Sequence, residues 1–109
     1  MTVSELSKDL GFTELALPDP MRKIDGVYIG DLLSWVMGKA SDGDAWITIM
    51  SNVNVIAVAT LSDVACVIFA EGVKPDSELI TLASEKGVNL LSAREPAYEI
   101  AVKLSGALK

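Results

Sequence analysis

The chain has 109 residues, half of them hydrophobic, and its formal net charge at pH 7 is −6. This length supports one domain around a single core, and the composition is that of a folded domain and not of a disordered segment. The nine basic residues are scattered, and a phosphate backbone is bound by clustered cations, so we expect no nucleic-acid partner.

The cysteine content and the apolar segments indicate where the protein works. The single cysteine, Cys66, lies in an apolar run and has no second cysteine with which to form an intrachain disulfide, which favours a reducing compartment. The first residues lack the pattern of a signal peptide. The longest apolar stretch, residues 53–61, is too short to cross a bilayer. We therefore expect a cytoplasmic protein with no membrane partner.

The first thirty residues predict a short helix followed by two strands. Residues 2–11 contain a helix-start threonine, a glutamate three positions later and a closing glycine, a pattern typical of a capped helix. Residues 12–17 predict a strand that ends where two prolines interrupt the chain. Residues 23–30 predict a second strand, with Gly26 as a bend or bulge.

A second helix is expected directly after this strand. Asp31 is a residue type that caps helices, and the apolar residues that follow it fall on one helical face. Those apolar residues are Leu32, Leu33, Val36, Met37 and Ala40. The helix ends in a loop of Gly, Ser and Asp, where Asp42 and Asp44 indicate a turn and not a cation site.

The remainder of the chain alternates regularly between strands and helices. The predicted strands are 45–50, 65–70 and 88–92, and the predicted helices are 51–63, 75–86 and 95–108. Strands that alternate with helices of this length are typical of a parallel sheet. We therefore expect an α/β domain over residues 1–109, with a central, mostly parallel sheet flanked by helices.

Residues 51–63 are the ambiguous segment, because their β-branched content also suits a strand. Parallel neighbouring strands need a crossover of about a dozen residues, which this segment supplies if it is helical, with Asn52 or Asn54 as its cap. Such a helix is apolar on nearly every side, so it needs more cover than one sheet face gives. The sequence therefore predicts a partner surface here, and we expect a homodimer.

The inventory of catalytic groups is small. The chain has no histidine, no G-x-x-x-x-G-K-[ST] phosphate loop and no G-x-G-x-x-G fingerprint. Cys66 lies in a predicted strand, where a buried thiol is inert. Trp35 and Trp46 are expected in the core or at an interface. We predict no enzyme activity, no catalytic residue, no metal and no cofactor.

Polar residues gather where the predicted parallel strands end. In open α/β sheets, ligands bind outside the carboxyl ends of the strands, next to the N-termini of helices. The alternative is that these residues only cap helices. The predicted ligand-binding residues are Ser51, Asn52, Asn54, Glu71, Gly72, Lys74 and Ser92.

Residues 30–104 resemble the DRTGG domain, most closely its stand-alone bacterial members. The resemblance rests on the "DLLSWVMG" helix, the "WITIM" strand and the "AEGVKPD" segment that leads into a helix. It implies a fold like the N-terminal domain of HPr kinase/phosphorylase. It also implies a regulatory or dimerising role, as for DRTGG domains inside phosphate acetyltransferases and CBS-containing pyrophosphatases.

The residues that give the family its name are mostly replaced in this chain. By the order of strands and helices, the family's Asp-Arg element falls on Ser51 and Asn52, and its Thr-Gly-Gly element falls on Ala70, Glu71 and Gly72. Only Gly72 matches. These replacements remove a cation and add a carboxylate, which disfavours an anionic ligand.

Two functions follow as hypotheses. The first is a non-enzymatic regulatory or interaction module, dimeric, that modulates a partner enzyme. Stand-alone members similar to this chain are often encoded beside hydrogenase and NADH-oxidising subunits, so the resemblance implies a partner in redox metabolism, a hydrogenase or an NADH-linked complex. The alternative is a small-molecule sensor that binds a nucleotide-like or carboxylate ligand at the carboxyl ends of the parallel strands.

Overall fold

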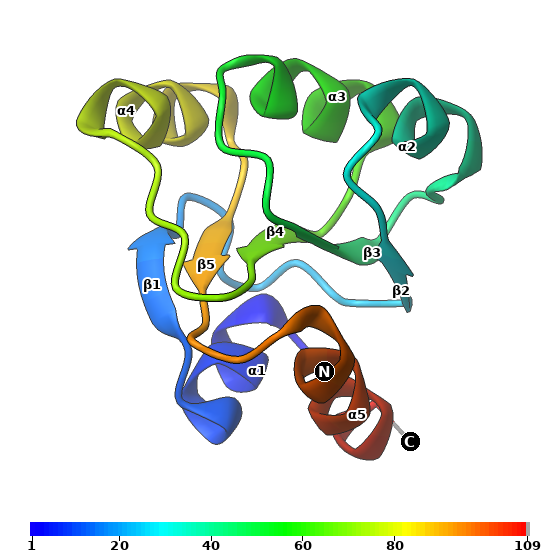
Figure 1. The fold of residues 1–109 in the computed structure, drawn as a ribbon. Helices are drawn as coiled ribbons and strands as arrows, with labels where there is room; N and C mark the ends of the chain where they lie inside the picture. The colour runs from blue at the N-terminus through cyan, green and yellow to red at the C-terminus, as the bar shows by residue number, and fades with distance from the viewer. Residues whose placement is uncertain (109) are drawn as a thin grey trace.

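The computed structural model describes residues 1–108, which form one five-stranded sheet with helices on both faces (Figure 1). The strand order across the sheet is β1-β5-β4-β3-β2. In chain order the elements are α1 (Val3–Leu10), β1 (Thr13–Ala16), β2 (Gly26–Ile29), α2 (Leu33–Lys39), β3 (Asp44–Thr48), α3 (Asn54–Ser62), β4 (Cys66–Phe69), α4 (Ser77–Lys86), β5 (Leu90–Ser92) and α5 (Ala97–Ala107).

The four strands β2 to β5 are parallel, and β1 joins β5 as an antiparallel edge strand. Helices α2, α3 and α4 connect successive parallel strands and cover one face of the sheet, while α1 and α5 cover the other (Figure 1). This arrangement confirms the predicted α/β domain with a mostly parallel sheet. It also places the carboxyl ends of all four parallel strands along one edge.

Each face of the sheet has its own core. Residues of β3, β4 and β5 point alternately to the two sides, as the period of a strand requires. On one side Trp46 and Val67 pack with Val55 and Leu79 under α3 and α4. On the other side α1 and α5 cover Ile47, Ile68 and Leu91. Because β4 is buried on both faces, all its side chains are apolar.

Several predictions of local structure are confirmed. Thr2 and Glu5 form a reciprocal capping box at the start of α1, and Gly11 ends that helix in the left-handed conformation (φ 70°). The ambiguous segment is helical, since residues 54–62 form α3. Cys66 is buried. Gly43, between the two aspartates of the predicted turn, has φ 82°, and Asp44 accepts a hydrogen bond from the Ser41 amide.

Gly26 is neither a bend nor a bulge. It begins β2 and pairs regularly with Asp44, and the parallel register continues without a break to Ile29. A Cβ atom at this position would lie 2.7 Å from the Asp44 carboxylate, so the glycine permits a close approach. The irregularity of the sheet lies instead in β1, between Glu14 and Ala16.

The predicted cap of the second helix is also wrong, and its predicted apolar face is confirmed only for Leu33, Val36 and Ala40, which pack against the core. The cap residue of α2 is Leu32, which makes no side-chain capping bond. Asp31 instead accepts hydrogen bonds from Thr48 and Ile49 of the neighbouring strand. Val36 alone is fully buried, whereas 58% of Leu32 and 52% of Met37 is exposed.

No helix within residues 1–108 is long and apolar enough to cross a membrane.

Candidate functional site

The loops that follow β3, β4 and β5 leave the sheet at the same edge. The parallel register places Thr48, Phe69 and Ser92 side by side, and each is the last residue of its strand. The amides of Ala70 and Ala93 continue the ladder to the carbonyls of Thr48 and Phe69. We call residues 49–52, 70–76 and 93–96, together with Asp31 after β2, the strand-end rim.

The loop after β3 contains the first group of predicted site residues. Ser51, Asn52 and Asn54 are all exposed. The Asn52 side chain accepts a hydrogen bond from the Asn54 amide at 2.9 Å, just as α3 begins. The cap residue of α3 is Val53, which makes no side-chain capping bond, so the prediction of Asn52 or Asn54 as the cap is wrong, and the Asn52 bond fastens only the turn that leads into the helix.

The loop after β4 turns through two residues in the left-handed conformation. Glu71 has φ 58° and Gly72 has φ 71°, and the Val73 amide donates to the Ala70 carbonyl at 3.1 Å. Two successive positive φ values with this bond are the pattern of a type I′ turn, which favours glycine at both central positions. The Thr-Gly-Gly element was assigned to this place, and Glu71 lies in a backbone conformation that favours glycine.

Hydrogen bonds join this turn to the loop after β5. The Glu71 amide donates to the Glu95 carbonyl and the Gly72 amide donates to the Ala93 carbonyl, both at 2.8 Å. Ser92 is buried, and its hydroxyl donates to the Val73 carbonyl at 3.3 Å. The amides that a ligand between β4 and β5 could use are thus already bonded within the chain.

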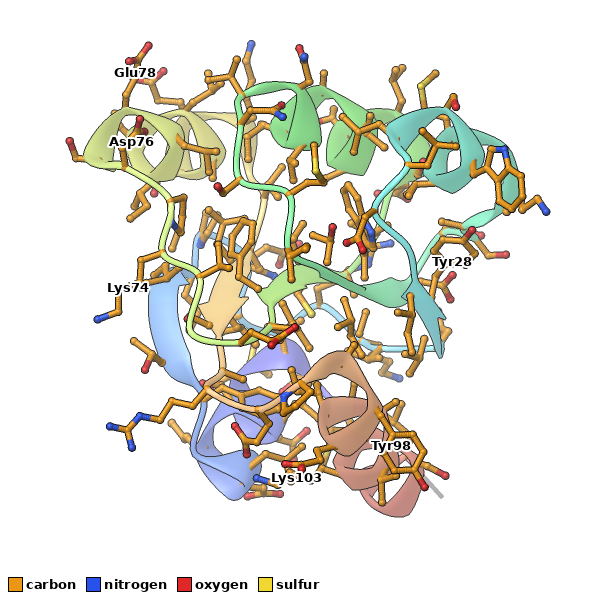
Figure 2. The ribbon with its side chains drawn as sticks, viewed as in Figure 1. Tyr28, Lys74, Asp76, Glu78, Tyr98 and Lys103 are labelled. Carbon is orange, nitrogen blue, oxygen red and sulfur yellow. The ribbon has the colours of Figure 1, made fainter. Side chains whose placement is uncertain are left out.

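The remaining predicted residue, Lys74, is exposed and points away from the body of the protein (Figure 2). The N-terminus of α4 that follows is capped by Asp76, which accepts from the Leu79 amide at 2.9 Å. In the part of the chain that the structure describes, no hydrogen bond links the loop 49–53 to the loop 70–76 apart from the strand ladder itself. The predicted residues thus form two groups on one edge.

One residue of this edge was assigned the wrong role from the sequence. The Asp31 carboxylate accepts from the buried Thr48 hydroxyl at 2.8 Å and from the Ile49 amide at 3.0 Å, so it fastens the end of β3 to the loop after β2. These partners are 17 and 18 positions away in the sequence. The sequence carries one signal of this contact: Asp31 comes directly after one strand, and the neighbouring strand ends in Thr48.

The structure supports no nucleophile or metal centre among the described residues. Complete burial raises the pKa of the Cys66 thiol to about 12, so it stays protonated and unreactive near neutral pH. No group of three or more acidic, cysteine or histidine side chains within residues 1–108 is arranged to hold a metal ion.

A hollow of about 490 Å³ lies away from the rim, between α3 and α4. Most of its lining is apolar, and two apolar residues on its α3 side are strongly exposed, with 46% of Val53 and 72% of Leu61 accessible to solvent. It is lined by Val53, Ile56, Ala57, Thr60, Leu61, Leu82 and Lys86. We call it the α3–α4 groove.

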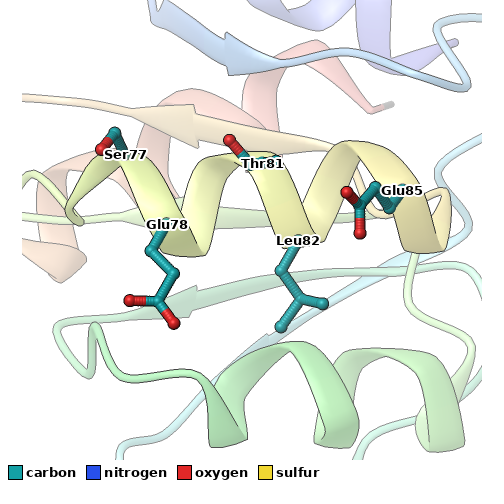
Figure 3. A pocket seen from close by; sticks show the side chains of 5 residues that line it. All are labelled: Ser77, Glu78, Thr81, Leu82 and Glu85. Carbon is teal, nitrogen blue, oxygen red and sulfur yellow. The ribbon is translucent and has the colours of Figure 1, made fainter.

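A second hollow, of about 350 Å³, runs along α4 and shares Leu82 with the groove. Its lining residues are Ser77, Glu78, Thr81, Leu82 and Glu85 (Figure 3). Glu78 and Leu82 project from α4 on the side of α3, whereas Ser77 and Thr81 project from another side of the helix (Figure 3). Leu82 therefore lies between a charged surface on α4 and the apolar groove.

The two tryptophans differ in their surroundings. Trp46 is fully buried, and its indole Nε1 donates to the Gly30 carbonyl at 2.8 Å. Trp35 is 58% exposed on α2, with the Lys39 ammonium 4.2 Å from the ring centroid. Trp46 is therefore a core residue, as one of the two expectations had it. Trp35 is not in the core and lies on the surface.

The protein belongs to the class of small α/β domains with a mostly parallel sheet, and it has a polar edge where the strands end. The family model of the DRTGG domain matches residues 21–107, so the chain belongs to the DRTGG domain family. This span includes the whole of residues 30–104, on which the resemblance was based. No curated protein sequence matches the chain.

Solved structures share the fold. One is the crystal structure of the CBS and DRTGG domains of the regulatory region of Clostridium perfringens pyrophosphatase, complexed with its activator, diadenosine tetraphosphate. The TM-score is 0.71 at 15% sequence identity, over 92% of this chain and 44% of that chain. The present chain therefore spans less than half of that regulatory region, and the likeness establishes the fold.

Proposed function

We propose that this chain is a regulatory and interaction module without catalytic activity, which works in the cytoplasm as a homodimer and modulates a partner enzyme. The observation that carries the proposal is the outward surface of α3, where Val53, Ala57 and Leu61 are exposed on a helix that has no charged residue. An exposed apolar stripe of this kind is typical of a contact surface. Membership of the family and the regulatory setting of the pyrophosphatase domains agree with it.

A hydrogenase or an NADH-linked redox complex is the partner that we propose. The support is the resemblance to stand-alone DRTGG proteins, which are often encoded beside the subunits of such enzymes. The partner would be a protein and not a nucleic acid, because the net charge is −6 and the cations are scattered. The chain itself would supply no cofactor.

Two measurements test this function. Sedimentation velocity at micromolar concentration should give twice the chain mass of 11.6 kDa. Affinity capture of the tagged chain from its native cells, followed by mass spectrometry, should enrich redox enzyme subunits above a tagged Leu61→Asp control. A monomer at all concentrations would contradict the dimer, and the absence of redox enzyme subunits from the captured proteins would contradict the partner.

A second candidate function is a small-molecule sensor at the strand-end rim, with a nucleotide-like or carboxylate ligand. Its support is the exposure of Ser51, Asn52, Glu71 and Lys74 at the carboxyl edge of parallel strands. An anionic ligand is disfavoured, because the Glu71 and Gly72 amides already donate hydrogen bonds to carbonyls within the chain. A thermal-shift screen tests it, because a ligand at 100 times its Kd stabilises by about 2.7 kcal/mol.

A further inference from the structure

Two ridges of residues border the α3–α4 groove. Helices α3 and α4 both cross back from the carboxyl edge of the sheet, so they run in the same direction (Figure 1). On α3 the ridge is Val53, Ala57 and Leu61, and on α4 it is Glu78, Leu82 and Lys86. Residues four apart lie on one face of a helix, so each ridge follows its helix from end to end.

Opposite charges stand at the two ends of the α4 ridge. Glu78 lies in the first turn and Lys86 in the last turn, and both are exposed. Eight residues of helix separate them by about 12 Å, which is too far for an ion pair between them. Within residues 1–108 the ion pairs are Arg22 with Asp63 and Lys103 with Glu95, so both ends of the ridge are free of a partner inside the chain.

This order of charges is self-complementary. A two-fold axis that passes near Leu82 reverses the ridge, so that an acidic end of one copy meets the basic end of the other. We propose that the α3–α4 groove is the two-fold interface of this protein, and that Glu78 pairs with the partner's Lys86 and Lys86 with the partner's Glu78. The inference rests on the proposed homodimer and specifies its surface.

The shape of the groove also fits a second copy of the chain. Leu61 protrudes, with 72% of it exposed, beside a hollow of about 490 Å³ that is lined in part by Val53, Ala57 and Leu82. In an isologous contact, each copy offers both the protruding leucine and the hollow that receives it. The groove lining has one cation, Lys86, and the adjoining hollow on α4 adds the carboxylates of Glu78 and Glu85, so the surface that two copies would share carries charges of both signs.

Charge exchange across the interface tests the proposal. The single variants Glu78→Lys and Lys86→Glu each convert two attractive contacts of the dimer into repulsive ones, and each should weaken dimerisation about tenfold. The double variant Glu78→Lys/Lys86→Glu restores both pairs and should dimerise within about threefold of the parent protein. An equimolar mixture of the two single variants should form a mixed dimer, seen by native mass spectrometry when one of them is tagged.

The matched control is Glu99→Lys, because Glu99 is also an exposed first-turn glutamate, on α5 and thus on the other face of the sheet. It should leave the dimer unchanged, and melting curves should confirm that all variants fold. A dimer that none of the charge variants weakens overturns the groove as its interface and leaves the homodimer standing. A monomeric parent protein overturns both. Loss of partner capture by the single variants, without change in the dimer, would assign the groove to a heterologous partner and overturn the proposal.

Discussion

The strand-end rim and the α3–α4 groove differ in how their chemical groups are satisfied. At the rim several polar groups have partners within the chain: Asp31 holds Thr48, the Asn52 side chain accepts from the Asn54 amide, and the amides of Glu71 and Gly72 bond to the loop after β5. In the groove Val53 and Leu61 are exposed to water, and both charged ends of the α4 ridge are without an intrachain partner among the described residues.

The difference separates residues that build the fold from residues that can serve an interaction. A satisfied polar group at a helix start stabilises the chain that contains it, so its presence alone does not indicate a ligand. An exposed apolar ridge does not stabilise the isolated chain, since its free energy of transfer from water is gained only when a partner covers it. Changes in the groove should therefore alter association, and changes at the rim should alter stability.

The largest expected effect is that of Leu61→Ser in the groove. Each dimer would lose two leucine contacts, and because burial of a leucine side chain is worth about 1.5–3 kcal/mol, the dissociation constant should rise by at least about a hundredfold. The unfolding of the monomer should barely change, since 72% of Leu61 is exposed in the isolated chain. Sedimentation velocity over a concentration series measures the first quantity, and urea unfolding of the diluted protein measures the second.

Val102→Ser is the control for this change. Val102 is likewise an exposed apolar residue, 52% exposed, on α5. Its replacement should leave both the dissociation constant and the unfolding free energy as they are. Should Val102→Ser weaken the dimer more than Leu61→Ser, the interface would lie on the α1–α5 face.

At the rim, Asp31→Ala should lower the free energy of unfolding by about 1–2 kcal/mol. The buried Thr48 hydroxyl loses its acceptor and the Ile49 amide loses its partner, which costs more than the removal of an exposed group. Asp31→Asn retains an acceptor oxygen, so it should lose less than Asp31→Ala. Equal losses in both variants would show that the charge and not the hydrogen-bond geometry matters, and a weaker dimer in either would place the rim in the interface.

The elements that the sequence predicts correctly depend on local patterns or on topology. The capping box of α1 is contained in four residues, and it is formed as predicted. The helical state of 54–62 followed from the crossover that parallel β3 and β4 require, although the residue types also suited a strand. Asp31 fails as a cap because its carboxylate contacts β3, which local sequence around the helix start cannot indicate.

The same limit applies to the two candidate sites. The apolar excess of α3 predicted a partner surface, and the exposure of Val53 and Leu61 agrees with it. The α4 ridge was missed, although its Glu-x-x-x-Leu-x-x-x-Lys spacing was visible, because its value depends on the neighbouring helix. The rim residues share an edge as expected, but the bonds from Glu71 and Gly72 to the loop after β5 depend on tertiary structure.

The smallest effect should come from Glu71→Gly, and its sign is opposite to that of the other rim variant. A side chain at φ 58° costs about 1–2 kcal/mol relative to glycine, and the greater freedom of glycine in the unfolded chain offsets about 0.5–1 kcal/mol of this. The free energy of unfolding of the variant, measured by urea denaturation, should therefore rise by about 0.5–1 kcal/mol, and its dimerisation should not change. Gly72→Ala, at φ 71° with nothing within 4 Å of the added methyl group, is the converse control and should destabilise through backbone strain alone.

Glu71→Gly also separates the two candidate functions, because it removes the carboxylate from the rim. If sulfate at low ionic strength raises the melting temperature of Glu71→Gly and not that of the parent protein, the rim can take an anion and the sensor function gains support. If sulfate affects neither, the amides of residues 71 and 72 remain committed to the loop after β5, and the rim serves the fold while the groove serves the partner.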